Sequence, residues 1–420
     1  VIETLLENNI TRERFKLLPP MTNKRKINAM KFMNMACQYS VISRPTLVPL
    51  LSCRMVRLTM EYGFCDDSIV GLATVGYCSY TFTENMRLGS KIAKVCEALI
   101  RDNPNEHLIR SRLCTELVVF HIFTQPAAAV MTQLPIMYES AKLTGDMESA
   151  TLARWNCCAF VFWSGAESLL NVSKHLSMCI KEALKHKQTT MLYCAMAYLN
   201  TCLYLSGETD AESDTKSFDE LNEIGKSTKA NLLLWQCHIC KICEYFFMRD
   251  YLAVISLCEA NPCPRPKRIL HGWRTFFEGV ACLSLARDTK QSKWRCTGEK
   301  AVWEMSRWAE MSPWNFESRY RLLQAELYYL DGDMASAEEA YNASVLSAQK
   351  HNYVNDEAIA CELYGIHLVE RKSTEKGVSQ LLSALGKYKE WGATKKAKEL
   401  QLFIETIHVA GHNSTYGKRP

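Results

Sequence analysis

Glycine and proline are scarce in this chain of 420 residues, which contains 18 glycines and 12 prolines. Both residues concentrate in turns, so their scarcity excludes a chain dominated by loops or by tight β-turns. A low content of both is typical of a protein in which helix occupies most of the length. Helix is therefore the secondary structure that we expect for most of this sequence.

The sequence also lacks the short motifs that build a catalytic centre. No H-E-x-x-H pair and no G-x-S-x-G elbow occurs. The nearest match to a phosphate-binding loop ends at Gly225-Lys226-Ser227, but Glu220 stands where its first glycine should be, and no strand pattern precedes it. We interpret this segment as a junction between helices. We predict no catalytic residue, no cofactor-binding residue and no cofactor, and hence no enzyme within this chain.

Cysteine, in contrast, is abundant, with 19 residues. Cysteines such as Cys157 and Cys158 lie inside apolar runs, which indicates free thiols that pack as small hydrophobic groups. Free thiols persist in a reducing compartment, so we expect a cytoplasmic protein. Cys237, Cys240 and Cys243 have a spacing seen in zinc sites, but on one helix they point in different directions. We expect them to be buried structural residues and predict no metal site.

Neither a membrane nor a nucleic acid is expected as a partner. The uncharged stretch 188–207 is long enough to cross a bilayer, but its amide and hydroxyl side chains make it too polar. The apolar stretch 117–138 is expected to break at Gln125-Pro126 and at Leu134-Pro135. The net charge is only +5, and the single basic cluster lacks the interleaved aromatic residues that stack on bases. That cluster, expected to be a solvated surface, consists of Arg12, Arg14, Lys16, Lys24, Arg25, Lys26 and Lys31.

What the chain does contain is a helix-ending pair of residues that returns about every 41 positions. Gly63, Pro104 and Gly145 are each 41 residues apart, and 207 residues, close to five further steps, separate Gly145 from Asn352. A fixed period of this length is typical of a solenoid of helical repeats. The junctions are Tyr62-Gly63, Asn103-Pro104, Thr144-Gly145, His186-Lys187, Lys226-Ser227, Pro266-Lys267, Met311-Ser312, His351-Asn352 and Trp391-Gly392.

Each unit breaks again about twenty residues after its junction, so one unit is helix, turn, helix, loop. These breaks include Ser164-Gly165, Ser206-Gly207, Arg249-Asp250, Asp331-Gly332-Asp333 and Lys372-Ser373. In the unit 311–351 the second helix places Ala337, Tyr341 and Ser344 on one face. This small-large-small order is the tetratricopeptide pattern. The next unit keeps it with Gly377, Leu381 and Ala384.

We therefore predict an all-α, right-handed superhelical solenoid of about nine to ten tetratricopeptide-like helix-turn-helix repeats. The period exceeds the ~34 residues of that repeat and also suits HEAT-type pairs. Residues 21–405 are assigned to the solenoid, 1–20 to a linker or helix that leads in from an upstream domain, and 406–420 to a polar tail. Such a stack leaves an extended concave surface on which a partner can bind.

Two further groups of residues fit structural roles. The acidic pairs Asp66-Asp67 and Asp356-Glu357 directly follow junctions, where the free N–H groups of a helix favour negative charge. We expect them to cap helices. The stretch between positions 273 and 314 is rich in tryptophan, which we expect to pack between units. Its members are Trp273, Trp294, Trp303, Trp308 and Trp314.

Both ends of the chain resemble one family. The similar features at the start are Pro-x-Leu-x-Pro-Leu at 45–50, Arg-Met-Val at 54–56 and Glu-Tyr-Gly at 61–63; near the end they are the repeat 332–365 and Trp-Gly-Ala at 391–393. These segments resemble the helical region of large signalling AAA-type ATPases. Chains of that family join a serine/threonine-kinase-like domain, the ATPase, a tetratricopeptide-like region, a GAF domain and a sensor histidine kinase.

The resemblance implies a signalling role but transfers no catalytic residue, because the catalytic motifs of that family belong to domains that are absent here. We expect a non-catalytic regulatory and interaction segment of a multidomain signal-transduction ATPase or kinase. Its expected partners are other protein segments, or flanking domains of the same polypeptide, on the concave surface. Two alternatives stay open: a free-standing adaptor that binds a peptide, and the effector-sensing superhelix of an ATPase-type transcription regulator. A phosphate loop encoded upstream in the reading frame would favour the segment of a multidomain ATPase or kinase. A helix-turn-helix encoded downstream would favour the transcription regulator.

Overall fold

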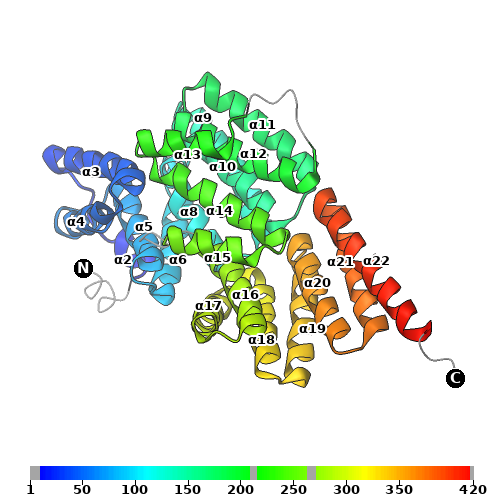
Figure 1. Ribbon diagram of the computed structural model, residues 1–420. Coiled ribbons are helices and arrows are strands. Elements are labelled where there is room, and N and C mark those ends of the chain that lie inside the picture. Colours follow the sequence, from blue (N-terminus) through cyan, green and yellow to red (C-terminus); the bar gives the residue numbers. More distant parts are fainter. Residues whose placement is uncertain (1–9, 209–214, 263–270, 417–420) are drawn as a thin grey trace.

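The computed structural model describes residues 10–208, 215–262 and 271–416, and within these ranges the chain is built from helices (Figure 1). The described residues form no strand beyond one isolated bridge between Pro20 and Phe64. The prediction of an all-helical repeat solenoid is confirmed. The helices are α2 Arg12–Lys16, α3 Lys24–Ser43, η1 Pro45–Leu47, α4 Val48–Tyr62, α5 Asp66–Thr81, α6 Met86–Arg101, α7 Glu106–Arg112, α8 Cys114–Thr124, α9 Ala127–Leu143, α10 Met147–Ser164, α11 Leu169–Lys185, α12 Thr189–Ser206, α13 Phe218–Ser227, α14 Asn231–Phe247, α15 Tyr251–Ala260, α16 His271–Thr289, α17 Ser292–Met311, α18 Pro313–Asp331, α19 Met334–Lys350, α20 Val354–Glu370, α21 Thr374–Trp391 and α22 Thr394–Tyr416.

The helices alternate between two roles along the chain. The first helix of a unit, such as α12 or α20, is buried on most of its circumference. The second helix, such as α11 or α21, buries one stripe and exposes the rest. A helix that is apolar all round needs neighbours on every side, whereas an amphipathic helix covers a surface. The first helix of each unit is therefore an inner helix, and the second is an outer helix.

The turns lie where the sequence predicts them, because left-handed residues end the helices there. Gly145, Gly165, Gly207, Gly332 and Gly392 have φ between +63° and +86°. Glycine adopts such φ values at little energetic cost. A left-handed residue after a helix ends it and lets the following backbone N–H groups bond to its last free carbonyls. The predicted junction Pro266-Lys267 lies outside the described residues. Four predicted breaks use a non-glycine residue with φ between +56° and +63°: Lys187, Arg249, Asn352 and Lys372.

Glycine at one of these four positions should stabilise the protein. Lys372→Gly removes the ~1–2 kcal/mol that a left-handed backbone costs an L-residue, offset in part by the greater unfolded-state freedom of glycine. We expect a gain of about 0.5–1 kcal/mol in the free energy of unfolding, measured by urea denaturation. Glu339→Gly, at an exposed position inside α19, is the control and should lose about 1 kcal/mol. A loss of stability in Lys372→Gly would contradict this account of the turns.

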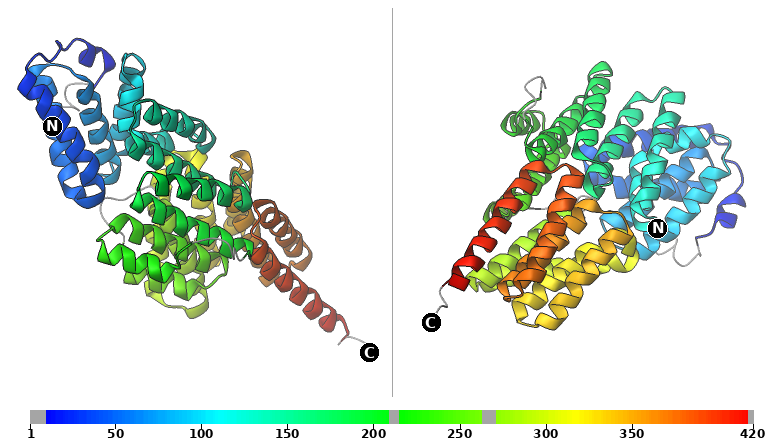
Figure 2. Two further views of the ribbon diagram at one scale, coloured as in Figure 1. Left: turned by 90° about the horizontal axis from the view of Figure 1, so that it is seen from above. Right: turned by 90° about the vertical axis from the view of Figure 1, so that its right-hand side faces the viewer.

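Helices α16–α22 form a second layer that lies against a first layer, helices α3–α15, so the two layers pack edge to edge (Figures 1 and 2). Asn315, in the first turn of α18, holds the turn between α8 and α9. Its Nδ2 donates to the carbonyl oxygens of Ile122 at 2.7 Å and Gln125 at 2.9 Å, and its Oδ1 accepts from the N–H of Ala127 at 2.9 Å. Residues about 190 positions apart are thereby joined.

The same kind of contact recurs one unit later along both layers. Asn355, in the first turn of α20, donates from Nδ2 to the carbonyl oxygen of Trp163 at 3.0 Å. The adjacent turn residue Gly165 has φ +63°, and a Cβ there would lie 2.8 Å from the Asn355 backbone nitrogen, so only glycine fits. One unit further on, Lys395 of α22 lies against the turn at Gly207. The repeat period therefore also sets the register between the layers.

Aromatic rings fill the seam between the two layers. Trp163 at the end of α10 packs on Trp273 at the start of α16, with ring centroids 5.4 Å apart. Phe123 at the end of α8 meets the edge of Trp308 of α17 at 5.9 Å. Such pairs stabilise by burial and by favourable ring geometry. The seam is therefore part of the hydrophobic core.

The core role predicted for the tryptophan-rich stretch holds for three of its members. Trp273, Trp294 and Trp308 are between 5% and 9% exposed. Trp314 is half-buried. The prediction is wrong for Trp303, which is 61% exposed because it lies on the outward face of α17, an outer helix.

Other expectations divide in the same way between confirmed and corrected. Ala337, Tyr341 and Ser344 are at most 1% exposed, which confirms the packing face of the second helix. The break expected at Leu134-Pro135 is wrong, since α9 continues through Pro135. Its neighbour Leu134 is fully buried, and this packing outweighs the missing backbone hydrogen bond. Helix α22 continues through Tyr416, into the segment 406–420 assigned to a polar tail.

Candidate functional site

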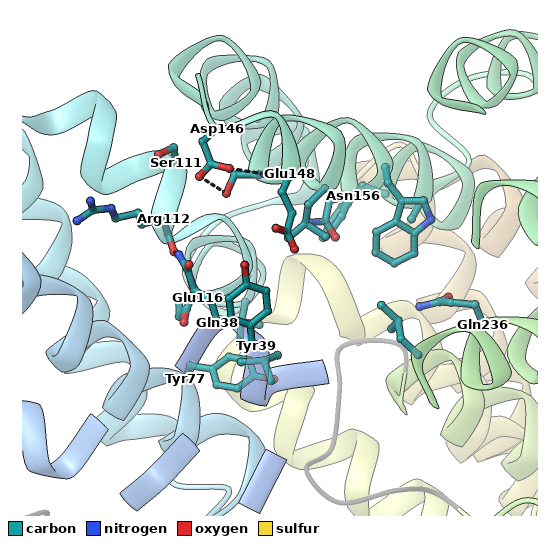
Figure 3. Close-up of a pocket in the computed structure, with 18 of the residues that line it drawn as sticks. Gln38, Tyr39, Tyr77, Ser111, Arg112, Glu116, Asp146, Glu148, Asn156 and Gln236 are labelled. Carbon is teal, nitrogen blue, oxygen red and sulfur yellow. Dashed lines mark hydrogen bonds between the residues drawn. The ribbon is translucent and has the colours of Figure 1, made fainter. Parts of the chain in front are cut away.

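A cavity with an empty volume of about 1360 Å³, including its open mouth, lies between helices of the first layer and the start of α16 (Figure 3). The inner helices α5, α8, α10 and α14 supply most of its lining, and the ends of α3 and α7 and the first turn of α16 supply the rest. This cavity, here called the lumen, lies between the inner helices. Its residues are therefore the candidate functional site.

Aromatic side chains dominate the apolar wall of the lumen. Trp155 and Trp163 project from α10, and Trp273 projects from α16. Trp155 and Trp163 each pack edge-on against the buried ring of Tyr198, with centroids 6.1 and 6.0 Å away. Because all four rings are almost fully buried by packing, the wall is formed before any ligand arrives. Preformed apolar pockets with a few polar groups are typical small-molecule sites.

A hydrogen-bonded chain orients one polar group of that wall. The indole N–H of Trp163 donates to the Tyr198 hydroxyl at 2.8 Å, and this hydroxyl donates to Gln236 Oε1 at 3.0 Å. The amide oxygen is thereby used, and Figure 3 shows the Gln236 side chain reaching from α14 into the lumen. Its Nε2 has no hydrogen-bond partner among the described residues, nor do the indole N–H groups of Trp155 and Trp273. Because the two indole nitrogens are buried away from any solvent, the Gln236 amide is the unused donor that the lumen presents.

Glu116, in the first turn of α8, is the buried acid of the lumen. It is 6% exposed, and Oε1 accepts from the Thr74 hydroxyl at 3.2 Å. Burial raises the pKa of the Glu116 carboxyl to about 7, because no basic group opposes the loss of hydration. A carboxyl with a strongly raised pKa in a cavity marks a candidate functional residue.

Replacement of this acid should change stability in a pH-dependent way. Because the folded-state pKa of Glu116 lies above its ordinary value of 4.5, its ionisation opposes folding above about pH 5 and stops doing so when the pH falls. We expect Glu116→Gln to raise the free energy of unfolding by about 2–3 kcal/mol at pH 8 and by little at pH 5. Denaturant unfolding at both pH values tests this. Equal effects at pH 8 and pH 5 would show that Glu116 does not titrate as described.

The polar residues near Glu148 give the lumen an acidic side. Asp146 caps α10 by accepting from the backbone N–H and the hydroxyl of Ser149 at 3.0 and 2.7 Å (Figure 3). Burial, followed by the Asp146 charge, raises the pKa of Glu148. Arg112 is the only basic residue among the described residues of the lining, and its Nη1 pairs with Asp67 at 3.2 Å. The lumen therefore carries an excess of negative charge.

The titratable side chains of the lumen are mainly carboxylic acids and phenols. The 20 described residues of its lining contain no histidine, cysteine or lysine. The described lining therefore offers Glu116 none of the imidazole, thiol or amine groups that often act as a base or a nucleophile.

The two segments whose sequences resemble a phosphate loop and a zinc site lie outside the lumen. Gly225-Lys226-Ser227 ends α13, as the predicted junction requires, and Lys226 Nζ pairs with Glu223 at 2.8 Å. The expected burial of Cys237, Cys240 and Cys243 is confirmed, since each is at most 1% exposed in α14. Where the structure is described, no three His, Cys, Asp or Glu side chains are grouped to hold a metal ion.

The basic cluster and the acidic pairs make contacts that the sequence did not reveal. Arg12 pairs with Asp102, and Lys16 Nζ lies 2.8 Å from the same carboxylate. Asp67 and Asp356 do lie in the first turn of a helix, but both are buried and ion-paired with the following unit or the preceding one. Sequence patterns did not identify Gln236 or Glu116 as candidate functional residues. The one available signal was a lone glutamate, Glu116, inside the apolar run 113–123.

Comparisons with known proteins add little. No protein-family model matches the chain, and no curated protein does. Among solved structures, one described as a "Circular tandem repeat protein with novel repeat topology and enhanced subunit contact surfaces" is similar at 12% identity, over 93% of this chain and 91% of that one, with a TM-score of 0.17. Within the described ranges, no helix is both long and apolar enough to cross a membrane.

Proposed function

We propose that this chain is a non-catalytic helical-repeat scaffold, the regulatory and interaction segment of a cytoplasmic, multidomain signal-transduction ATPase or kinase. The stacked helical units support the scaffold role, since such stacks are used to present surfaces to other proteins. The similarity of both ends of the chain to the helical region of signalling ATPases supports the wider context. Its partners are flanking domains or other protein segments, with neither nucleic acid nor membrane involved.

The observation that carries the interaction role is an exposed apolar row on α3. Phe32, Met35 and Tyr39 are 78%, 54% and 60% exposed, although their spacing places them on one side of the helix. Tyr39 also lines the lumen. Contiguous exposed apolar groups on a soluble surface mark binding sites for protein. We assign this row to contact with a flanking segment of the same polypeptide.

The test is the double variant Phe32→Ser/Met35→Ser in the full-length protein. We expect weaker regulation of the ATPase or kinase activity, with unchanged basal turnover, because the chemistry lies in other domains. Leu346→Ser is the matched control, since Leu346 is an exposed apolar residue (56%) on the outer helix α19. Unaltered regulation in the double variant would contradict the proposal, as would an equal loss in the control.

One of the two alternatives is favoured by a specific feature. A superhelix that senses a small effector needs a cavity with polar groups in an apolar wall, and the lumen, with Glu116 and Gln236 in its lining, supports that function. Neither function requires the other, because the row on α3 and the interior of the lumen are separate surfaces apart from Tyr39.

A further inference from the structure

The buried acids of this protein follow a rule with one exception. Seven carboxylates are buried among the described residues, and six of them have a basic side chain within 4 Å. Burial of an unpaired charge costs several kcal/mol, so such pairing is the usual arrangement. Glu116 is the exception. The six pairs are Asp67–Arg112, Glu244–Lys241, Glu326–Arg287, Asp356–Arg319, Glu357–Lys387 and Glu362–Lys396.

Glu244 shows what is missing at Glu116. The hydroxyl of Thr201, on the preceding inner helix, donates to Glu244 Oε1 at 3.1 Å, just as Thr74 donates to Glu116 at 3.2 Å. At Glu244 a lysine, Lys241, completes the site with its Nζ 2.9 Å away.

At Glu116 the corresponding place holds no cation. The residue three positions earlier, in the place of a lysine, is Leu113. Arg112, one residue before it, is turned to Asp67, with its Nη1 3.2 Å from that carboxylate. The site is therefore the same carboxylate arrangement with its positive charge removed.

Among the described residues, no other element supplies that charge. The titratable groups that interact with Glu116 from the surrounding helices are the thiols of Cys37 on α3, Cys78 on α5 and Cys96 on α6. Burial raises the pKa of each thiol, so all three are neutral near pH 7. The lumen, which Glu116 lines, is the remaining direction from which a cation can reach it.

The chemistry of the rest of the lumen indicates what kind of cation fits. Trp155, Trp163 and Trp273 give an aromatic wall, and a cation near such rings gains electrostatic attraction to their faces. The free amide N–H₂ of Gln236 adds one hydrogen-bond donor. A metal ion would need several oxygen ligands around it, and the described residues do not group them.

We infer that the lumen binds a small organic ammonium ion, with its charged nitrogen at Glu116, its apolar body against Trp155, Trp163 and Trp273, and a hydrogen-bond acceptor at Gln236 Nε2. This inference does not depend on which domains flank the chain. The ligand supplies the positive charge that Lys241 supplies to Glu244.

Three probes of equal shape but different charge test the inference on the whole chain by calorimetric titration at pH 8. The probes are 2-phenylethylamine, 2-phenylethanol and phenylacetate. We expect the amine to bind at least ten-fold more tightly than the alcohol, and phenylacetate to bind least. An amine that binds no better than the alcohol, or no detectable binding of the amine, would overturn the inference.

Two isosteric variants assign the preference to one carboxylate. Glu116→Gln should remove the preference for amine over alcohol and keep the binding of the alcohol, which rests on the aromatic wall. Glu244→Gln, a buried acid outside the lumen, should keep the preference of the unmodified protein. A preference that survives in Glu116→Gln would overturn the inference.

A pH titration provides a check that needs no variant. Between pH 8 and pH 5 the amine stays protonated and only the protein titrates, so binding of the amine should weaken at least ten-fold while binding of the alcohol stays constant. A constant amine affinity over this range would contradict a role for Glu116. Regulation by flanking domains is measured with the α3 variants in the full-length protein, so either result stands without the other.

Discussion

Asn315→Ala is expected to lower the free energy of unfolding by about 3–5 kcal/mol. Asn315 is 5% exposed and makes three hydrogen bonds to backbone groups of the first layer. Its amide nitrogen donates to the carbonyls of Ile122 and Gln125, at 2.7 and 2.9 Å. Its amide oxygen accepts from the N–H of Ala127 and the hydroxyl of Tyr353, at 2.9 and 2.8 Å. Alanine removes the partner of the Gln125 carbonyl, the Ala127 N–H and the Tyr353 hydroxyl, whereas the Ile122 carbonyl keeps the Ser312 hydroxyl at 2.8 Å. Each orphaned buried group costs about 1–3 kcal/mol, with partial relaxation between them.

The measurement is urea denaturation followed by circular dichroism. Asn342→Ala is the control, since Asn342 is exposed on the outer helix α19, and it should change stability by less than about 0.5 kcal/mol. A loss below about 1 kcal/mol would mean that Asn315 does not join the layers.

Arg319→Met is expected to cost a similar amount, about 3–5 kcal/mol at pH 7.5. Arg319 is 1% exposed, and its Nη2 lies 2.9 Å from Oδ2 of Asp356. It also donates to the backbone carbonyl of Asn315 at 3.2 Å, and its guanidinium lies over the ring of Trp273 at 4.6 Å. Methionine fills similar space but leaves Asp356, itself 5% exposed, with no opposite charge.

This second loss should depend on pH with a defined sign. Burial raises the pKa of Asp356, and Arg319 opposes that rise. Without Arg319 the folded-state pKa moves further above the ordinary value of 3.8, so the penalty is present at neutral pH and fades as the acid is protonated. Unfolding of the single variant at pH 7.5 and pH 5 measures this, and Asp356→Asn in the Arg319→Met background should recover part of the stability at pH 7.5. A penalty that grows toward pH 5 would contradict the assignment.

The sequence predicted those parts of the fold that depend on neighbouring residues. The turns at Gly145, Gly332 and Gly392 follow from local preference for left-handed backbone, and the buried face of Ala337 and Tyr341 follows from helical spacing. Both signals repeat with the 41-residue period and reinforce one another. Pro135 shows the limit, because packing around α9 outweighs the local preference of proline.

The contacts between the layers left no such signal. Asn315 binds backbone groups about 190 residues away, and a carbonyl or an N–H group is present at nearly every position, so no side-chain pattern marks the partner. The candidate site was hidden for a related reason. Glu116 stands out as a lone acid in an apolar run, but its significance lies in the absence of a base, which depends on where Arg112 and every other cation point in space.

Small-angle X-ray scattering of the chain tests most directly the claim that the second layer of helices, α16–α22, packs against the first layer, α3–α15. With the two layers packed together, the radius of gyration should be about 22–27 Å, close to the value for a compact chain of this length. An open superhelix, in which Asn315 and Asn355 do not reach the first layer, would extend lengthwise, and a value above roughly 35 Å would contradict the stacked arrangement.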